Sequence, residues 1–130
     1  MAVAWCFADE RHAGAEAILD SLSQSAQAIA PSIWPFEVAN ALLIGERRNR
    51  ISVAQVTLLL RHLGNLPITL DPVQTESAFE RILPFARQER LTEYDATYLE
   101  LAIREGLPLA TLDADLRRAA RKVGVRLAEM

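Results

Sequence analysis

The sequence predicts an α/β fold in which helices flank a central parallel sheet. Short, continuously apolar segments alternate with longer segments whose apolar residues recur at helical spacing. Parallel strands that are covered on both faces are uniformly apolar in this way, and a helix usually connects one to the next. No repeat, linker or change of composition divides the chain, so we expect a single domain over residues 1–130.

Turn residues and caps indicate the limits of the elements in the first half of the chain. Pro35 is tolerated in the first turn of a helix, and Ser52 is a suitable N-cap for the next one. Gly64 and Asn65 then end the helix that Ser52 begins. The expected segments are an apolar start at 1–7, an alanine-rich helix at 13–19, a polar loop at 21–27, a strand at 28–33, helices at 32–50 and 52–63, and a strand at 66–70.

The second half of the chain is organised around residues 91–116. An apolar repeat after Asp95 is typical of a helix packed on a core, Gly106 is a suitable C-terminal stop, and Pro108 cannot continue the helix. The expected segments are a helix at 75–90 with a kink at Pro84, a helix that ends before Gly106, a buried strand at 107–111, a basic helix at 115–122 and a last strand at 125–128.

Composition excludes several classes of protein. Hydrophobic residues make up 51% of the chain, which excludes a disordered protein. The single cysteine, Cys6, excludes an internal disulfide and is typical of a reducing cytoplasm. No apolar run is long enough to span a membrane, and the start of the chain does not resemble a signal peptide. A net charge of -3 means that any contact with nucleic acid is local. We therefore expect a cytoplasmic protein.

Three acids stand where a functional site is expected. Glu37 is the one ionisable residue between Ile33 and Ile44, and a carboxylate among apolar residues is costly unless it is paired, protonated or bound to a metal. Asp113 follows a strand, and ligands of parallel sheets bind beyond the carboxyl ends of the strands. Asp95 begins a helix for which Thr92 is the expected cap. Each acid also has a plain structural interpretation, as a solvent-facing glutamate, a first-turn acid or a helix cap.

Convergence of these carboxylates would indicate a metal-dependent nuclease. Clustered carboxylates raise one another's pKa unless a cation lies between them, and hard oxygen ligands select Mg²⁺ or Mn²⁺ over zinc. The two histidines, His12 and His62, are too far apart in the sequence to suggest a zinc site. A metal held in this way activates water for in-line attack on a phosphodiester.

The segments WPFEVANALL, LTEYDATYLELA and LPLATLDADL closely resemble the PIN-domain ribonucleases, and most closely the VapC-type toxins of bacterial toxin–antitoxin pairs. The resemblance implies a three-layer α/β/α fold and a metal-dependent endoribonuclease that acts as a toxin. It also implies that Glu37, Asp95 and Asp113 are catalytic metal ligands, and that Asn40 and Thr111 are supporting polar groups. Asp115 would be an auxiliary acid, although its preferred interpretation is that of a first-turn helix residue.

One feature departs from the family pattern. The family begins with a hydrophobic strand that ends in an aspartate, whereas residues 1–7 of this chain resemble the helix that follows that strand. Neither Asp9 nor Glu10 can replace the aspartate, because both lie beyond the helix. We expect a start upstream of Met1, weak or no nuclease activity for this polypeptide, and activity for an extended one.

Basic clusters and apolar helices suggest partners. The arginines are interpreted either as solvated helix ends or as contacts with RNA phosphates. The family resemblance implies a cognate antitoxin and a homodimer, for which the helices at 33–44 and 52–63 are candidate surfaces. The candidate RNA-binding residues are Arg47, Arg48, Arg117 and Arg118, with Arg50, Arg121 and Lys122 beside them.

Two other enzyme and signalling classes fit the sequence less well than the nuclease. A haloacid-dehalogenase-type phosphatase needs a large domain after its aspartates, and only 15 residues follow Asp115. A receiver domain needs a lysine near a late strand end, and the sole lysine, Lys122, lies within the last expected helix. The remaining alternative is a non-catalytic PIN-like module that binds a protein partner.

Overall fold

Residues 1–10 and 12–128 are described by a computed structural model of the chain. Their contacts divide them into two units, each with its own core. The first unit takes in residues 1–29 and 33–69, and the second takes in residues 30–32 and 70–128. None of the helices in the described part combines the length and the apolar character needed to cross a lipid bilayer.

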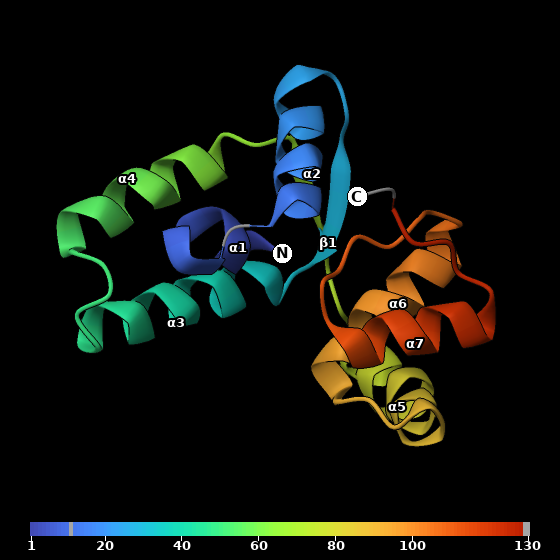
Figure 1. Cartoon of the computed structure of the whole chain (residues 1–130). Coiled ribbons are helices and arrows are strands. Elements are labelled where there is room, and N and C mark those ends of the chain that lie inside the picture. Colours follow the sequence, from blue (N-terminus) through green and yellow to red (C-terminus); the bar gives the residue numbers. More distant parts are fainter. Residues whose placement is uncertain (11, 129–130) are drawn as a thin grey trace. The chain divides into compact units, whose positions relative to one another are not determined.

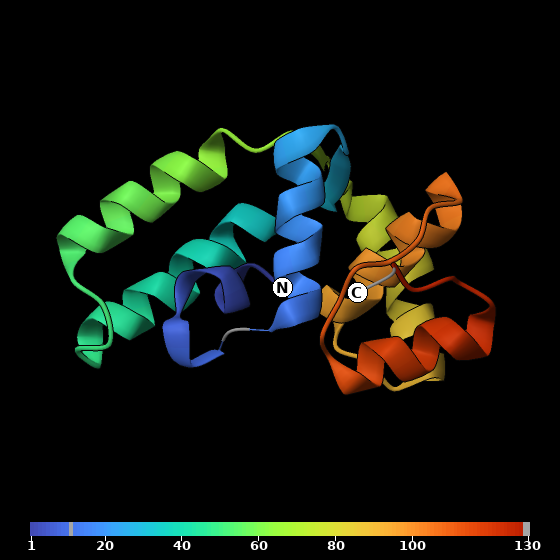
Figure 2. The ribbon, with the colours of Figure 1, turned by 45° about the horizontal axis from the view of Figure 1, so that its top comes forward.

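Helices make up most of the first unit. Its helix α1 contacts the 3₁₀-helix η1, α2 and α3, and α3 contacts α4 (Figure 1). The turn over residues 48–52 joins α3 to α4 in a helical hairpin, which is clearest in Figure 2. The bounds are Ala2–Cys6 for α1, Ala8–Glu10 for η1, Ala13–Gln24 for α2, Trp34–Arg47 for α3 and Val53–Gly64 for α4.

The apolar faces of these helices form the core of the first unit. Trp5 joins α1 to α2, because its Nε1 donates a hydrogen bond of 2.7 Å to the carbonyl oxygen of Ala15. Cys6 packs against the same core, and burial raises the pKa of its thiol. The buried members are Ala2, Phe7, Val38, Leu42, Val56 and Leu63.

In the first unit, α4 follows the prediction, whereas α2 and α3 differ from the prediction in extent: α3 spans Trp34–Arg47 in place of the predicted 32–50. Ser52 and Gln55 form a capping box at the start of α4, which confirms the predicted N-cap. Helix α2, however, continues to Gln24 through the segment predicted as a loop. The hydroxyls of Ser21 and Ser23 donate to carbonyl oxygens one turn earlier, and Leu22 is buried, so the polar run stays helical.

The described sheet consists of the strands β1 (Ala28–Pro31) and β2 (Ile68–Asp71). Ala28 N donates to Pro67 O, and Ser32 N donates to Asp71 O. The two bonded residue pairs have the same separation in the sequence, as they do when the strands are parallel. The strands predicted at 107–111 and 125–128 are reduced to one parallel bridge between Leu109 and Leu127. Pro108 has no N–H for a ladder, and the amide of Asp113 bonds to the Thr111 side chain instead.

The second unit contains the π-helix η2 and three α-helices. Helix α5 contacts η2 and α6, and α6 also contacts η2 and α7 (Figure 2). The kink predicted at Pro84 takes the form of wide π-helical turns just before it, since proline cannot donate the usual hydrogen bond. The bounds are Ser77–Ile82 for η2, Leu83–Glu89 for α5, Glu93–Glu105 for α6 and Ala114–Val123 for α7.

Ion pairs connect the elements of the second unit. Arg104 of α6 binds Asp71 and Glu100, with nearest N–O distances of 2.7 and 3.0 Å, and its hydrogen bonds to these carboxylates raise its pKa. Glu89, at the end of α5, is buried, and one of its oxygens lies 3.3 Å from the ammonium of Lys122 in α7. The buried carboxylate therefore depends on the charge of an exposed lysine.

Arg90 ends α5 in the left-handed conformation, with φ of 56° and ψ of 42°. This conformation is strained for residues that carry a Cβ, and glycine adopts it freely. Arg90→Gly is therefore expected to raise the free energy of unfolding by about 1 kcal/mol, as measured by urea denaturation.

Gly106 provides the matched control for Arg90→Gly. It ends α6 with φ of 65°, and a Cβ there would meet no atom within 4 Å. Gly106→Ala is thus expected to lower the free energy of unfolding by about 1 kcal/mol through backbone strain alone. A loss of stability in Arg90→Gly would contradict the argument from strain.

Candidate functional site

Asp113 is the N-cap of α7. Its Oδ2 accepts a hydrogen bond of 2.9 Å from the amide of Leu116, and its own amide donates to Thr111 Oγ1 at 3.1 Å. The structural interpretation of Asp113 as a cap is therefore confirmed. The side chain is exposed, and its Oδ1 has no hydrogen-bond partner in the described part of the chain. Asp113 can therefore cap α7 through one oxygen and offer the other to a ligand.

Asp95 lies in the first turn of α6 and is half-buried. The N-cap of this helix is Thr92, whose Oγ1 accepts a hydrogen bond of 3.1 Å from the amide of Asp95. The predicted cap is confirmed. Asp95 and Asp113 thus lie at the N-terminal ends of two helices of the same unit, where the helix dipole stabilises a negative charge.

Glu37 lies in the first turn of α3, in the first unit. Its side chain is exposed, which agrees with the interpretation of Glu37 as a solvent-facing glutamate; its role as a metal ligand stays a prediction. Phe36 beside it is itself 77% exposed, because α3 buries only a narrow face. Burial lowers the pKa of the Met1 amino group, and the charge of Glu37 opposes this decrease, which indicates that the two groups are close. Asn40 is exposed one turn later.

The described residues contain no group of three or more histidine, cysteine, aspartate and glutamate side chains that could hold a metal ion. Asp95 and Asp113 belong to the second unit, and Glu37 belongs to the first. The donors are carboxylates, which suit Mg²⁺ or Mn²⁺ by their chemistry, and Asp113 has an oxygen to offer. That these three acids share one ion stays a prediction.

Asp115 and Thr111 lie on either side of Asp113. Asp115 is exposed in the first turn of α7, and its carboxylate lies 3.9 Å from the guanidinium of Arg118. Thr111 is buried, and its hydroxyl oxygen accepts the hydrogen bond from Asp113. Asp115 therefore occupies the position of a first-turn helix residue, and Thr111 supports the loop that carries Asp113.

The candidate RNA-binding arginines differ in their surroundings. Arg47 and Arg48 are exposed at the end of α3, and Arg118 is exposed on α7. Arg117 is half-buried, and its Nη1 donates a hydrogen bond of 3.0 Å to the carbonyl oxygen of Thr111. Arg50 binds Asp9 and Glu10 and lies over the ring of Phe7, at 4.2 Å from its centroid.

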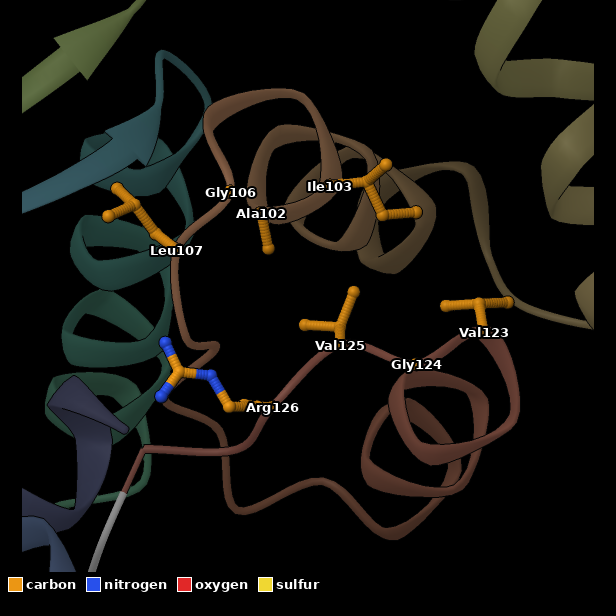
Figure 3. A pocket seen from close by; sticks show the side chains of 8 residues that line it. All are labelled: Ala102, Ile103, Gly106, Leu107, Val123, Gly124, Val125 and Arg126. Carbon is orange, nitrogen blue, oxygen red and sulfur yellow. The ribbon is translucent and has the colours of Figure 1, made fainter.

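A pocket of about 220 Å³ lies at the C-terminal ends of α6 and α7. Figure 3 shows side chains from both segments around the hollow, with Arg126 on one side. None of the predicted site residues lines it, and it is smaller than the pockets of about 300–1,000 Å³ that hold most small ligands. Its lining residues are Ala102, Ile103, Gly106, Leu107, Val123, Gly124, Val125 and Arg126.

Comparisons with known proteins give one consistent result. The PIN domain profile matches residues 1–122. Ribonuclease VapC3 of Mycobacterium tuberculosis, in strains CDC 1551 and H37Rv, is 34% identical over 90 residues, which cover 69% of this chain and 63% of that protein. The crystal structure of PAE2754 from Pyrobaculum aerophilum matches with a TM-score of 0.57 and 29% identity, over 68% of this chain and 59% of that one. The chain therefore spans less than two thirds of the length of these relatives.

Proposed function

Because the chain belongs to the PIN-domain family, we propose that it is a metal-dependent endoribonuclease, the toxin of a toxin–antitoxin pair. The similarity to Ribonuclease VapC3 supports the activity. The observation that carries the proposal is the placement of Asp95 and Asp113 at the starts of α6 and α7. We further propose that residues 1–130 form one PIN-like domain and that the protein acts in the cytoplasm, which its single cysteine favours.

In this proposal Asp95, Asp113 and Glu37 bind Mg²⁺ or Mn²⁺, with Asp115 as an auxiliary acid. The ion, when bound, supplies activation of water and stabilisation of the leaving oxygen. The N-termini of α6 and α7 stabilise the negative charge of the two aspartates before any ligand arrives. Thr111 holds the backbone of Asp113 through its buried hydroxyl, and Asn40 supports the site from the helix of Glu37.

RNA, an antitoxin and a second copy of the chain are the proposed partners. The exposed Arg47, Arg48 and Arg118 supply positive charge for RNA phosphates in a chain of net charge -3. The hairpin of α3 and α4 supplies apolar surface for the antitoxin and the homodimer. Its exposed apolar residues are Phe36, Leu43, Ile44, Val53, Leu58 and Leu60.

A non-catalytic PIN-like module that binds a protein partner is the second candidate. The observation that supports it is the apolar surface that α3 and α4 leave exposed. The same apolar surface of α3 and α4 would then serve the main function.

Metal-dependent cleavage of mixed cellular RNA tests the proposal. We expect cleavage that requires Mg²⁺ or Mn²⁺ and is lost with a chelator and in Asp95→Asn. If the folded protein neither cleaves RNA nor binds Mn²⁺, the nuclease is refuted and the binding module remains.

A further inference from the structure

Arg117 and Arg118 are neighbours on α7 with different surroundings. Arg118 is 56% exposed and lies 3.9 Å from Asp115, as expected of a solvated surface arginine. Arg117 is half-buried, and its Nη1 reaches back 3.0 Å to the carbonyl oxygen of Thr111, six residues earlier. Its guanidinium therefore binds the backbone of the loop that precedes α7.

This hydrogen bond completes the fixation of the segment from Thr111 to Asp113. The buried hydroxyl of Thr111 accepts the amide hydrogen of Asp113, and Oδ2 of Asp113 accepts that of Leu116. Upstream, Leu109 is held by the bridge to Leu127. Arg117 binds the carbonyl oxygen of Thr111. The backbone is therefore restrained both before and after Asp113.

The position of Arg117 is not explained by the electrostatics of α7 itself. Cations are favoured at the C-terminal end of a helix, whereas this guanidinium folds back toward the N-terminal end. Its hydrogen bond to the carbonyl oxygen of Thr111 offsets this cost. The side chain is thus held by the loop, and not by the helix dipole.

We propose that Arg117 is a positioning residue for Asp113. By holding the Thr111 carbonyl, it restrains the loop so that the unpaired oxygen Oδ1 of Asp113 is presented to a divalent cation. Removal of groups that orient a metal ligand typically weakens metal binding about 10–100-fold. The role toward the cation rests on the proposed function, whereas the restraint of the loop does not.

Two readouts on purified protein test this role, with Arg121→Met, at an exposed arginine in the last turn of α7, as the charge-matched control. The first is hydrogen exchange at the amides of Asp113 and Leu116, and the second is the dissociation constant for Mn²⁺ by calorimetry. We expect Arg117→Met to speed exchange and to raise the dissociation constant, each about 10-fold, and Arg121→Met to change neither. Arg117→Lys, which keeps one donor and the charge, should recover part of both.

Each other result has a defined meaning. Unchanged exchange in Arg117→Met, or equal changes in Arg121→Met, would overturn the positioning role. If the wild-type chain binds no Mn²⁺ at all, the proposed metal centre fails, and the exchange data alone decide on Arg117. Thermal unfolding confirms that each variant is folded, and Arg117→Gln, which is too short to span to Thr111, replaces Arg117→Met if the latter does not fold.

Discussion

Asp113→Asn is expected to reduce metal-dependent RNA cleavage and Mn²⁺ affinity by about 100-fold or more, while the chain stays folded. Even the loss of a group that only orients a metal ligand costs about 10–100-fold, so the loss of a ligand charge should cost at least as much. Stability is retained because asparagine caps helices about as well as aspartate, and its amide oxygen can accept the hydrogen bond from Leu116.

Asp113→Ala separates the two roles of this residue. It removes the cap as well as the charge, so the free energy of unfolding should fall by about 1 kcal/mol in urea denaturation. Ser52→Ala is the matched control, because it removes the cap of α4 at a similar cost and leaves every proposed ligand and its backbone bonds in place. If Asp113→Asn cleaves RNA and binds Mn²⁺ like the wild type, Asp113 is a cap only.

Gly45→Ala is expected to lower the free energy of unfolding by about 1 kcal/mol. A Cβ at Gly45 would lie 2.7 Å from Cζ and 2.9 Å from Cε1 of Phe7, and 3.3 Å from Cγ2 of Ile51. Phe7 is only 4% exposed and is covered by the guanidinium of Arg50, so the ring has little room to move. Overpacking of this kind costs about 1–3 kcal/mol, more than the gain of about 1 kcal/mol from alanine in a helix.

Gly64→Ala isolates the helix gain from the clash. Gly64 ends α4, and a Cβ there would meet no atom within 4 Å, so this variant should be more stable by up to about 1 kcal/mol. Combining Gly45→Ala with Phe7→Leu should cost less than the sum of the two single changes, since a smaller side chain relieves the clash. Wild-type stability of Gly45→Ala in urea denaturation would show that the Phe7 ring yields.

Local signals in the sequence predicted the helix ends correctly, because capping depends on residues a few positions apart. The caps at Ser52 and Thr92 and the left-handed Gly106 are all found. The strand predicted at 107–111 was wrong in extent, because strand pairing depends on partners far along the chain and Pro108 cannot join a ladder. The family resemblance supplied the three-layer fold class, which helix and strand periodicity alone would not distinguish.

The candidate site was likewise predictable where it depends on neighbouring residues in the sequence, and not where it depends on tertiary contacts. The placement of Asp95 and Asp113 at helix starts follows from neighbouring residues, and both are found there. The sequence left the exposure of Glu37 open, because an apolar helix in a two-helix hairpin can leave much of its surface uncovered. The bond from Arg117 to Thr111 was also missed, since it depends on the path of a loop that no periodic pattern encodes.

The separate cores also have a spectroscopic consequence. Both tryptophans, Trp5 and Trp34, pack on the core of the first unit, whereas both tyrosines, Tyr94 and Tyr98, belong to the second. Selective excitation of tryptophan therefore reports on the first unit alone, while far-UV circular dichroism reports on the helices of both. Coincident transitions of the two signals would indicate cooperative unfolding of the whole chain. An earlier or later loss of the tryptophan signal would show that the first unit has a stability of its own. The native chain thus carries the probes for this comparison without any label.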